Sequence, residues 1–182
     1  MSLITNCTAL PDHLVLACNT YKKGGISAVA IIDPTASIPD FTSTTDWNAA
    51  IALGTVKVIK NVKGIIAPGA PVEGENALAC GSQTMLDGFD NTITWKDFNV
   101  TYENDLFYAT LNISRAYIAV YYCQEQEIRV FTPTQLIQFS TPPATSPESN
   151  REKQMYETTA KWFDDAGAFN PVYNAPPNIF TV

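Results

Sequence analysis

Three carboxylates lie close together near the middle of the chain, at Asp97, Glu103 and Asp105. A pair of carboxylates is the catalytic equipment of most glycoside hydrolases, where one acts as the acid and the other as base or nucleophile. The same residues have a structural explanation, because acids in the first turn of a helix cap its free amides and oppose its dipole. We favour the structural explanation and keep a carboxylate-dependent hydrolase as an alternative.

Cysteine and histidine offer a second chemistry, metal binding. Cys7, His13 and Cys18 could supply three ligands, but their spacing fits no common site and no fourth ligand accompanies them. Cys80 and Cys123 are isolated, and no CxxC pair occurs. Cys123 extends an apolar strand, where a reduced cysteine acts as a small hydrophobe. We therefore expect no metal site and a reducing compartment.

Other catalytic signatures are missing from the sequence. Its single histidine, His13, follows no nucleophile motif such as GxSxG, and neither a phosphate-binding GxxxxGK[ST] loop, a GxGxxG turn nor an HExxH pair is present. The sequence nominates no catalytic, cofactor-binding or metal-binding residue. We expect a protein that is not an enzyme and needs no cofactor.

Length and composition set the class of protein. The 182 residues suffice for one domain, 1–182, and 46% of them are hydrophobic while only 16% are charged. The net charge of −7 and the scattered Lys and Arg residues argue against sequence-specific binding of nucleic acid. No apolar run approaches the length of a membrane span, so no membrane partner is expected.

In the first half of the chain, apolar patterning predicts a strand, a helix and a second strand. The strand covers 24–33, and the helix covers 43–54, with Thr45 or Asp46 as its cap and Gly54 at its end. The second strand covers 55–66. Its valines are expected on one face, and its lysines are expected in solvent, where they protect an edge from unwanted pairing. In the helix, Trp47, Ala50 and Ile51 share one face.

In the second half, a strand at 92–98 is followed by a helix at 102–113. Residues of that helix recur at helical spacing and predict its apolar face: Tyr102, Leu106, Ala109, Thr110 and Ile113. A hairpin is expected over 115–131. A further strand is expected over 153–163, with aromatic residues on both of its faces. The predicted fold is mainly β, an antiparallel β-sandwich or barrel with one or two short flanking α-helices.

Three segments are expected outside this framework. The Gly- and Pro-rich stretch 65–88 predicts a long loop or an irregular hairpin, and the Pro- and Ser-rich stretch 140–152 predicts a second long loop. The terminal segment 164–182 carries apolar residues that must dock somewhere, either on the same domain or on a neighbouring copy. Two-faced strands, long loops and an apolar terminus are typical of a protein that pairs with copies of itself.

The order of these elements resembles a known class of protein. From about residue 46 to residue 180, the chain resembles structural proteins of tailed bacteriophages, particularly tail-tube-like proteins of phages that infect Bacteroidetes hosts. The resemblance is carried by four stretches, TDWNAAIALGTVKVIKNVKG, GFDNTITWKDFNVTYENDLFYATLN, YIAVYYCQEQEIRVF and YETTAKWFDDAGAFNPVYNAPPNIF. The N-terminal stretch CTALPDHLVLACNTYKKGG has no counterpart in such proteins.

The resemblance implies a virion structural protein, located in the tail and assembled in the cytoplasm of the host bacterium. Six copies would form a ring, and rings would stack into a tube that conducts the genome. The partners would be copies of the same chain, other tail proteins, and DNA that passes without sequence-specific contact. An acidic wall would repel phosphates and let the duplex slide.

Two further functions stay open. A capsid, collar or decoration protein of the same kind of particle would share the resemblance. A carbohydrate- or surface-binding β-sandwich module would instead use exposed aromatic side chains, for which the candidates are Trp95, Tyr121, Tyr122 and Trp162.

Overall fold

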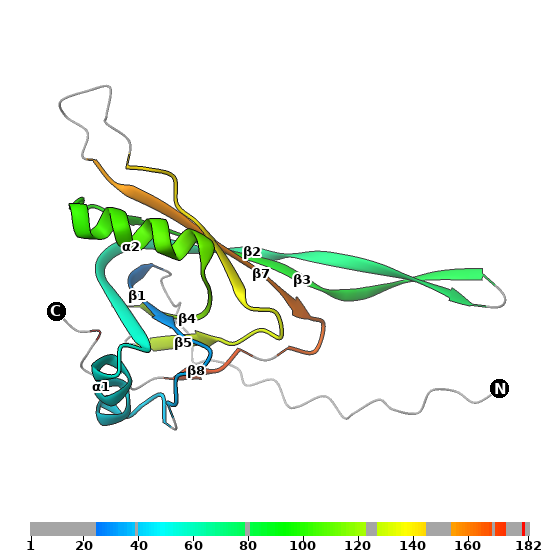
Figure 1. The fold of residues 1–182 in the computed structure, drawn as a ribbon. Helices are drawn as coiled ribbons and strands as arrows, with labels where there is room; N and C mark the ends of the chain where they lie inside the picture. The colour runs from blue at the N-terminus through cyan, green and yellow to red at the C-terminus, as the bar shows by residue number, and fades with distance from the viewer. Residues whose placement is uncertain are drawn as a thin grey trace, which may run out of the picture.

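The described part of the chain forms one antiparallel sheet of eight strands with two short helices (Figure 1). This computed structural model describes residues 25–38, 40–78, 81–122, 127–144, 154–168, 170–173 and 180, without the side chains of 75–85. The mainly β fold predicted from the sequence is confirmed. The elements are β1 Ile26–Ile32, α1 Thr44–Ala52, β2 Val56–Leu78, β3 Gly81–Asp97, α2 Tyr102–Ile113, β4 Arg115–Tyr122, β5 Glu127–Phe131, β6 Ile137–Ser140, β7 Tyr156–Asp165 and β8 Val172–Tyr173.

The strand pairings close on themselves. The strand order is β1-β2-β3-β7-β6-β4-β5-β8, and β1 also pairs with β4. Strands β1, β2, β3, β7, β6 and β4 therefore form a closed circuit of neighbours, which gives the sheet a sandwich- or barrel-like form. The hairpin predicted over 115–131 is present as the antiparallel pair β4 and β5.

Strands β1 and β4 are buried on both faces, which explains their nearly continuous apolar sequences ISAVAII and RAYIAVYY. One face, with Val29 and Ile118, joins the core that α2 covers. The opposite face, with Ala30 and Ala119, joins a second core beneath α1. The two strands thus form the wall between two hydrophobic cores.

A residue of the C-terminal segment completes the second core. The ring of Phe180 lies edge-on to Trp47 of α1, with centroids 5.1 Å apart, and stacks on Tyr121 of β4 at 5.7 Å. Phe180 is therefore docked on its own domain. The neighbouring residues 174–179 and 181–182 lie outside the described part of the chain.

Both helices form where the sequence predicts them, but the cap of α1 differs from the prediction. The cap is Ser43, whose hydroxyl accepts a hydrogen bond from the backbone amide of Asp46, instead of Thr45 or Asp46 itself. Gly54 follows the helix with a φ of +76°, the left-handed conformation that glycine adopts without strain.

The predicted inner face of α2 is wrong. The side chains that point into the core are Tyr108 and Leu111, while Tyr102, Leu106 and Ile113 are 73%, 53% and 85% exposed. This helix carries two apolar stripes on opposite sides, and helical periodicity alone does not say which of them meets the sheet.

A bulge in β2 overturns the predicted alternation of its valines. Ala28 pairs with Lys60 and Ile26 with Gly64, so β2 holds extra residues over this interval, and Asn61 there has a φ of +60°. Across this irregular interval the side chains change faces. Val62 consequently belongs to the core under α2, whereas Val56 belongs to the core under α1.

Of the two alternatives predicted for 65–88, the irregular hairpin is confirmed, because the stretch forms most of the long antiparallel pair of β2 and β3, whose register shifts between Ala67 and Ala70 and between Val72 and Glu73. Pro68 falls in an irregularity of the pairing between Ala67 and Ala70, and Pro71 lies on a part of β2 that no second strand flanks. Proline is tolerated at such positions, since it removes no ladder hydrogen bond there. The prediction of a loop at 140–152 falls mostly outside the described residues, which end at 144 and resume at 154.

Gly88 marks the point where the hairpin leaves the body, and we predict that it tolerates no side chain. A Cβ there would overlap the carbonyl oxygen of Asp164 and the ring of Phe163 on β7. Gly88→Ala should lower the free energy of unfolding by about 2 kcal/mol, as overpacking does. Gly167→Ala is the matched control, since nothing lies within 4 Å of its Cβ, and chemical denaturation of both variants checks the difference.

Candidate interaction surfaces

The three predicted carboxylates do not converge on a common cavity as a catalytic pair would. Asp97, at the end of β3, is only 5% exposed and accepts hydrogen bonds from the Tyr108 hydroxyl at 2.8 Å and from the backbone amide of Asn99 at 2.9 Å. Asp105, in the first turn of α2, accepts from the Tyr156 hydroxyl at 2.7 Å. Glu103 is exposed on the outer side of the same turn.

Two tyrosines whose rings are in contact join the buried Asp97 and the more exposed Asp105. The rings of Tyr108 on α2 and Tyr156 on β7 have centroids 4.4 Å apart. Burial, and next the hydrogen bond to Asp105, raise the pKa of Tyr156 to about 12. Burial, and next the hydrogen bond to Asp97, raise the pKa of Tyr108 as well. Both phenols stay protonated near neutral pH and donate to the carboxylates, so the group fastens α2 to β3 and β7.

The other residues considered for ligand or metal binding are either buried or outside the described part of the chain. Four aromatic side chains considered for carbohydrate binding are buried in the core, namely Trp95, Tyr121, Tyr122 and Trp162. Cys7, His13, Cys18, Cys80 and Cys123 lie outside the described residues. Within the part of the chain that is described, no group of three or more His, Cys, Asp or Glu side chains could hold a metal ion.

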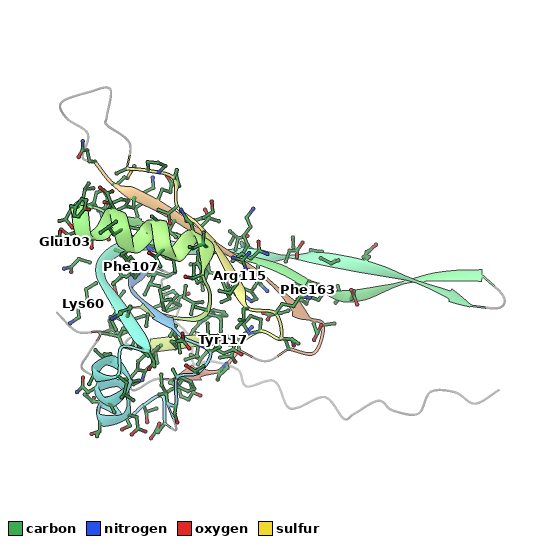
Figure 2. All side chains as sticks on the ribbon, viewed as in Figure 1. Lys60, Glu103, Phe107, Arg115, Tyr117 and Phe163 are labelled. Carbon is green, nitrogen blue, oxygen red and sulfur yellow. The ribbon has the colours of Figure 1, made fainter. Side chains whose placement is uncertain are left out.

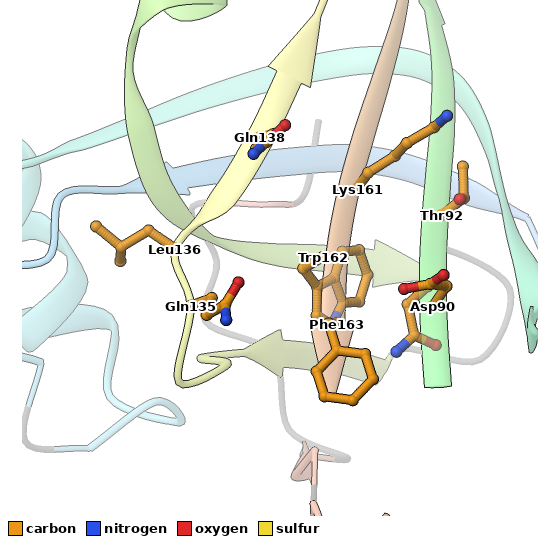
Figure 3. A pocket seen from close by; sticks show the side chains of 9 residues that line it. Asp90, Thr92, Gln135, Leu136, Gln138, Lys161, Trp162 and Phe163 are labelled. Carbon is orange, nitrogen blue, oxygen red and sulfur yellow. The ribbon is translucent and has the colours of Figure 1, made fainter. Parts of the chain in front are cut away.

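One surface cavity of about 320 Å³ lies across β3, β6 and β7 (Figure 3). Asp90, Gln138 and Lys161 line it from these three strands, together with the aromatic side chains of Trp162 and Phe163. Charged and amide groups of this kind bind water or a polar partner.

A second cavity, of about 520 Å³, lies between α2 and the segment that follows β6. Its polar lining includes Asp105, Tyr108 and Tyr156, all engaged in the hydrogen bonds described above. Asn112 also lines it, and its side chain both accepts from the amide of Thr141 and donates to the carbonyl of Thr141. These side chains form hydrogen bonds that hold α2 to β3, to β7 and to the segment after β6.

The end of the β2–β3 hairpin is the first candidate interaction surface. Pairing of β1 with β2 ends at Gly64, and pairing of β7 with β3 ends at Gly88. Among the described strands, residues 73–78 and 81–87, which we call the arm, therefore pair only with each other, and they extend away from the body (Figure 1). At the base of the arm, the carbonyl of Asp87 accepts a hydrogen bond from the amide of Ala166. Leu86 is 45% exposed on it, and Ile65 nearer the body is 65% exposed.

The outer side of α2 is the second candidate. We call Tyr102, Leu106, Ala109 and Ile113 the outer stripe, because all four are exposed and share one face of the helix. Phe107 is half-buried on the side of the helix nearer the sheet (Figure 2). The sequence contains the signal for this surface, since periodicity identified the stripe and only its orientation was wrong.

Comparison with known proteins identifies no relative: no family model, no curated protein and no solved structure matches the chain. Among the described residues, neither helix has the length and apolar character that crossing a membrane requires. The resemblance to tail-tube proteins therefore stays a prediction from the residue pattern. The arm, the outer stripe and the charge of the chain are the features that bear on its function.

The hydrogen bond between Tyr108 and Asp97 is predicted to be structural. Tyr108→Phe leaves a buried carboxylate without its phenol donor, so it should lower the free energy of unfolding by about 2 kcal/mol. Tyr102→Phe, on the exposed side of the same helix, should change it by less than about 0.5 kcal/mol. Urea denaturation of both variants measures the two effects, and equal values would contradict the assignment.

Proposed function

We propose that this chain is a virion structural protein, a tail tube subunit that forms hexameric rings which stack into a conduit for DNA. The observation that supports the proposal most directly is the arm. The hexameric arrangement and the virion location come from the resemblance over residues 46–180.

The arm supports assembly because of how it is built. A two-stranded ribbon without further support is at best marginally stable in water, and its outer edges carry unpaired backbone groups that can pair with another chain. From Glu73 to Leu78 the arm has neither a third strand nor a helix of the described chain beside it. A neighbouring subunit would supply the missing support.

The geometry suits a head-to-tail contact. A ring of identical subunits needs two different surfaces on each copy, one that contacts the next subunit and one that receives the previous one. The arm extends from one end of the body, so it contacts a neighbour at a place distinct from its own origin (Figure 1). Such contacts close into a ring when the rotation between subunits permits.

The charge of the chain suits a conduit for DNA. With 18 acidic against 11 basic residues, the net charge of −7 disfavours adhesion to phosphates. The exposed lysines Lys57 and Lys60 lie on a stretch of β2 that pairs with β1 alone, where lysine protects a free edge. A capsid, collar or decoration protein would share the arm, and the form of the assembly separates these alternatives.

No observation favours the carbohydrate-binding alternative. The aromatic side chains that suggested it form the core, and aromatic platforms for sugars have to be exposed.

Removal of the arm should abolish rings and leave the body folded. Because Val72 pairs with Gly88, a variant in which Asn-Gly replaces residues 73–87 closes the hairpin with a two-residue turn. Negative-stain electron microscopy should show six-fold rings or tubes for the wild type and none for this variant. Circular dichroism should show a folded β protein in both.

A matched control keeps the arm at full length and replaces only Ala79 and Cys80 with Asn-Gly. This control should assemble like the wild type. A wild-type chain that stays monomeric at high concentration and forms no ring would contradict the proposal. Particles with another regular form would favour a different virion component.

A further inference from the structure

The outer stripe of α2 has a composition that fits a second copy of itself. Tyr102, Leu106 and Ile113 are apolar and exposed, and Ala109 lies between them near the middle of the helix. The stripe is directly opposite the inward side chains Tyr108 and Leu111, so the helix's own sheet cannot cover it. An exposed apolar strip of this kind on an ordered helix indicates an interaction site.

The charges around the stripe are arranged asymmetrically along the helix. Glu103 and Asp105 lie in the first turn, and the last turn contains no basic residue. Arg115, exposed, follows the helix at the start of β4. Figure 2 shows Glu103 and Arg115 at opposite ends of α2. One end of the stripe is therefore flanked by negative charge and the other by positive charge.

Glu103 and Arg115 also lie on the same side of the stripe. Arg115 lines a surface cavity of about 240 Å³ together with Phe107 and Thr110 of α2. Residues 103, 107 and 110 follow one another at intervals of four and three, so they occupy one side of the helix. A second α2 laid antiparallel across the stripe therefore brings the Glu103 of each helix to the Arg115 of the other.

We propose that two copies of this chain associate through their outer stripes, with the two α2 helices antiparallel and related by a two-fold axis at Ala109. Glu103 lies six residues before Ala109 and Arg115 six residues after it, so each acid meets the partner's base. Leu106 and Ile113, three before and four after, come opposite one another.

Three physical features stabilise this pairing. The small side chain of Ala109 lets the helices approach closely at the crossing point, since interaxial distance depends on the residues in contact. The apolar side chains of Leu106 and Ile113 become buried, which is favourable in water. The antiparallel helix dipoles also attract each other. An isologous contact of this kind closes in a pair. The proposal does not depend on the tail tube, because it uses α2 and leaves the arm free.

Charge reversal tests the register of the two helices. Glu103→Arg or Arg115→Glu alone should raise the dimer dissociation constant of the full chain by roughly tenfold, because each places two like-charge contacts in the symmetric interface. The double variant with both changes restores opposite charges and should restore the wild-type constant. Analytical ultracentrifugation at low salt measures all four proteins, and 1 M salt should reduce the differences.

Leu106→Asp tests the apolar contact. This variant should stay monomeric at the protein concentrations at which the wild type dimerises. Leu53→Asp is the matched control, since Leu53 is 80% exposed beyond the end of α1 and should leave the dimer unchanged. The chain without its arm should still dimerise, and Leu106→Asp should not remove rings. These two results separate failure of this proposal from failure of the tail-tube proposal.

Three outcomes would overturn the antiparallel pairing. They are a wild-type chain without a dimer, a Leu106→Asp variant that associates like the wild type, and a double reversal that fails to restore association. A wild-type monomer in which another segment of the same chain protects the α2 amides from hydrogen exchange would also overturn it.

Discussion

The fold depends on the placement of β1 between β2 and β4. This strand pairs on both edges and is buried on both faces, so nearly every side chain and the backbone outside the irregularity between Ile26 and Ala28 have a partner inside the molecule. Its pairing with β4 closes the circuit of strands. The two cores meet across it, which means that α1 and α2 stabilise one framework from opposite sides.

The sequence predicts this framework well where hydrophobic pattern and local chemistry agree. The boundaries of α2, the glycine that ends α1 and the β4–β5 hairpin follow from signals within a few residues. Such features need no knowledge of the partner element, because their side-chain spacing already fixes them.

Errors arose where a distant contact decides the outcome. The face that α2 presents to the sheet depends on Tyr108, whose hydroxyl meets Asp97 across the helix–sheet boundary. The bulge at Asn61 depends on how β2 must pass β1. Glycine and proline in 65–88 left both a loop and an irregular hairpin open, because local preference does not show which segment a long strand will pair with. The interaction surfaces are therefore the part of the molecule that sequence pattern alone orients least well.

The arm also has a mechanical consequence. Six residues of strand, from Glu73 to Leu78, reach about 20 Å beyond the last three-stranded part of the sheet. A ribbon held at one end is displaced most at the residues farthest from its support, so Leu78 and Gly81 can reach a volume that the body itself does not occupy. A molecule of this form can therefore contact another molecule at a greater distance than its body alone could. The first contact can form before the two bodies are aligned.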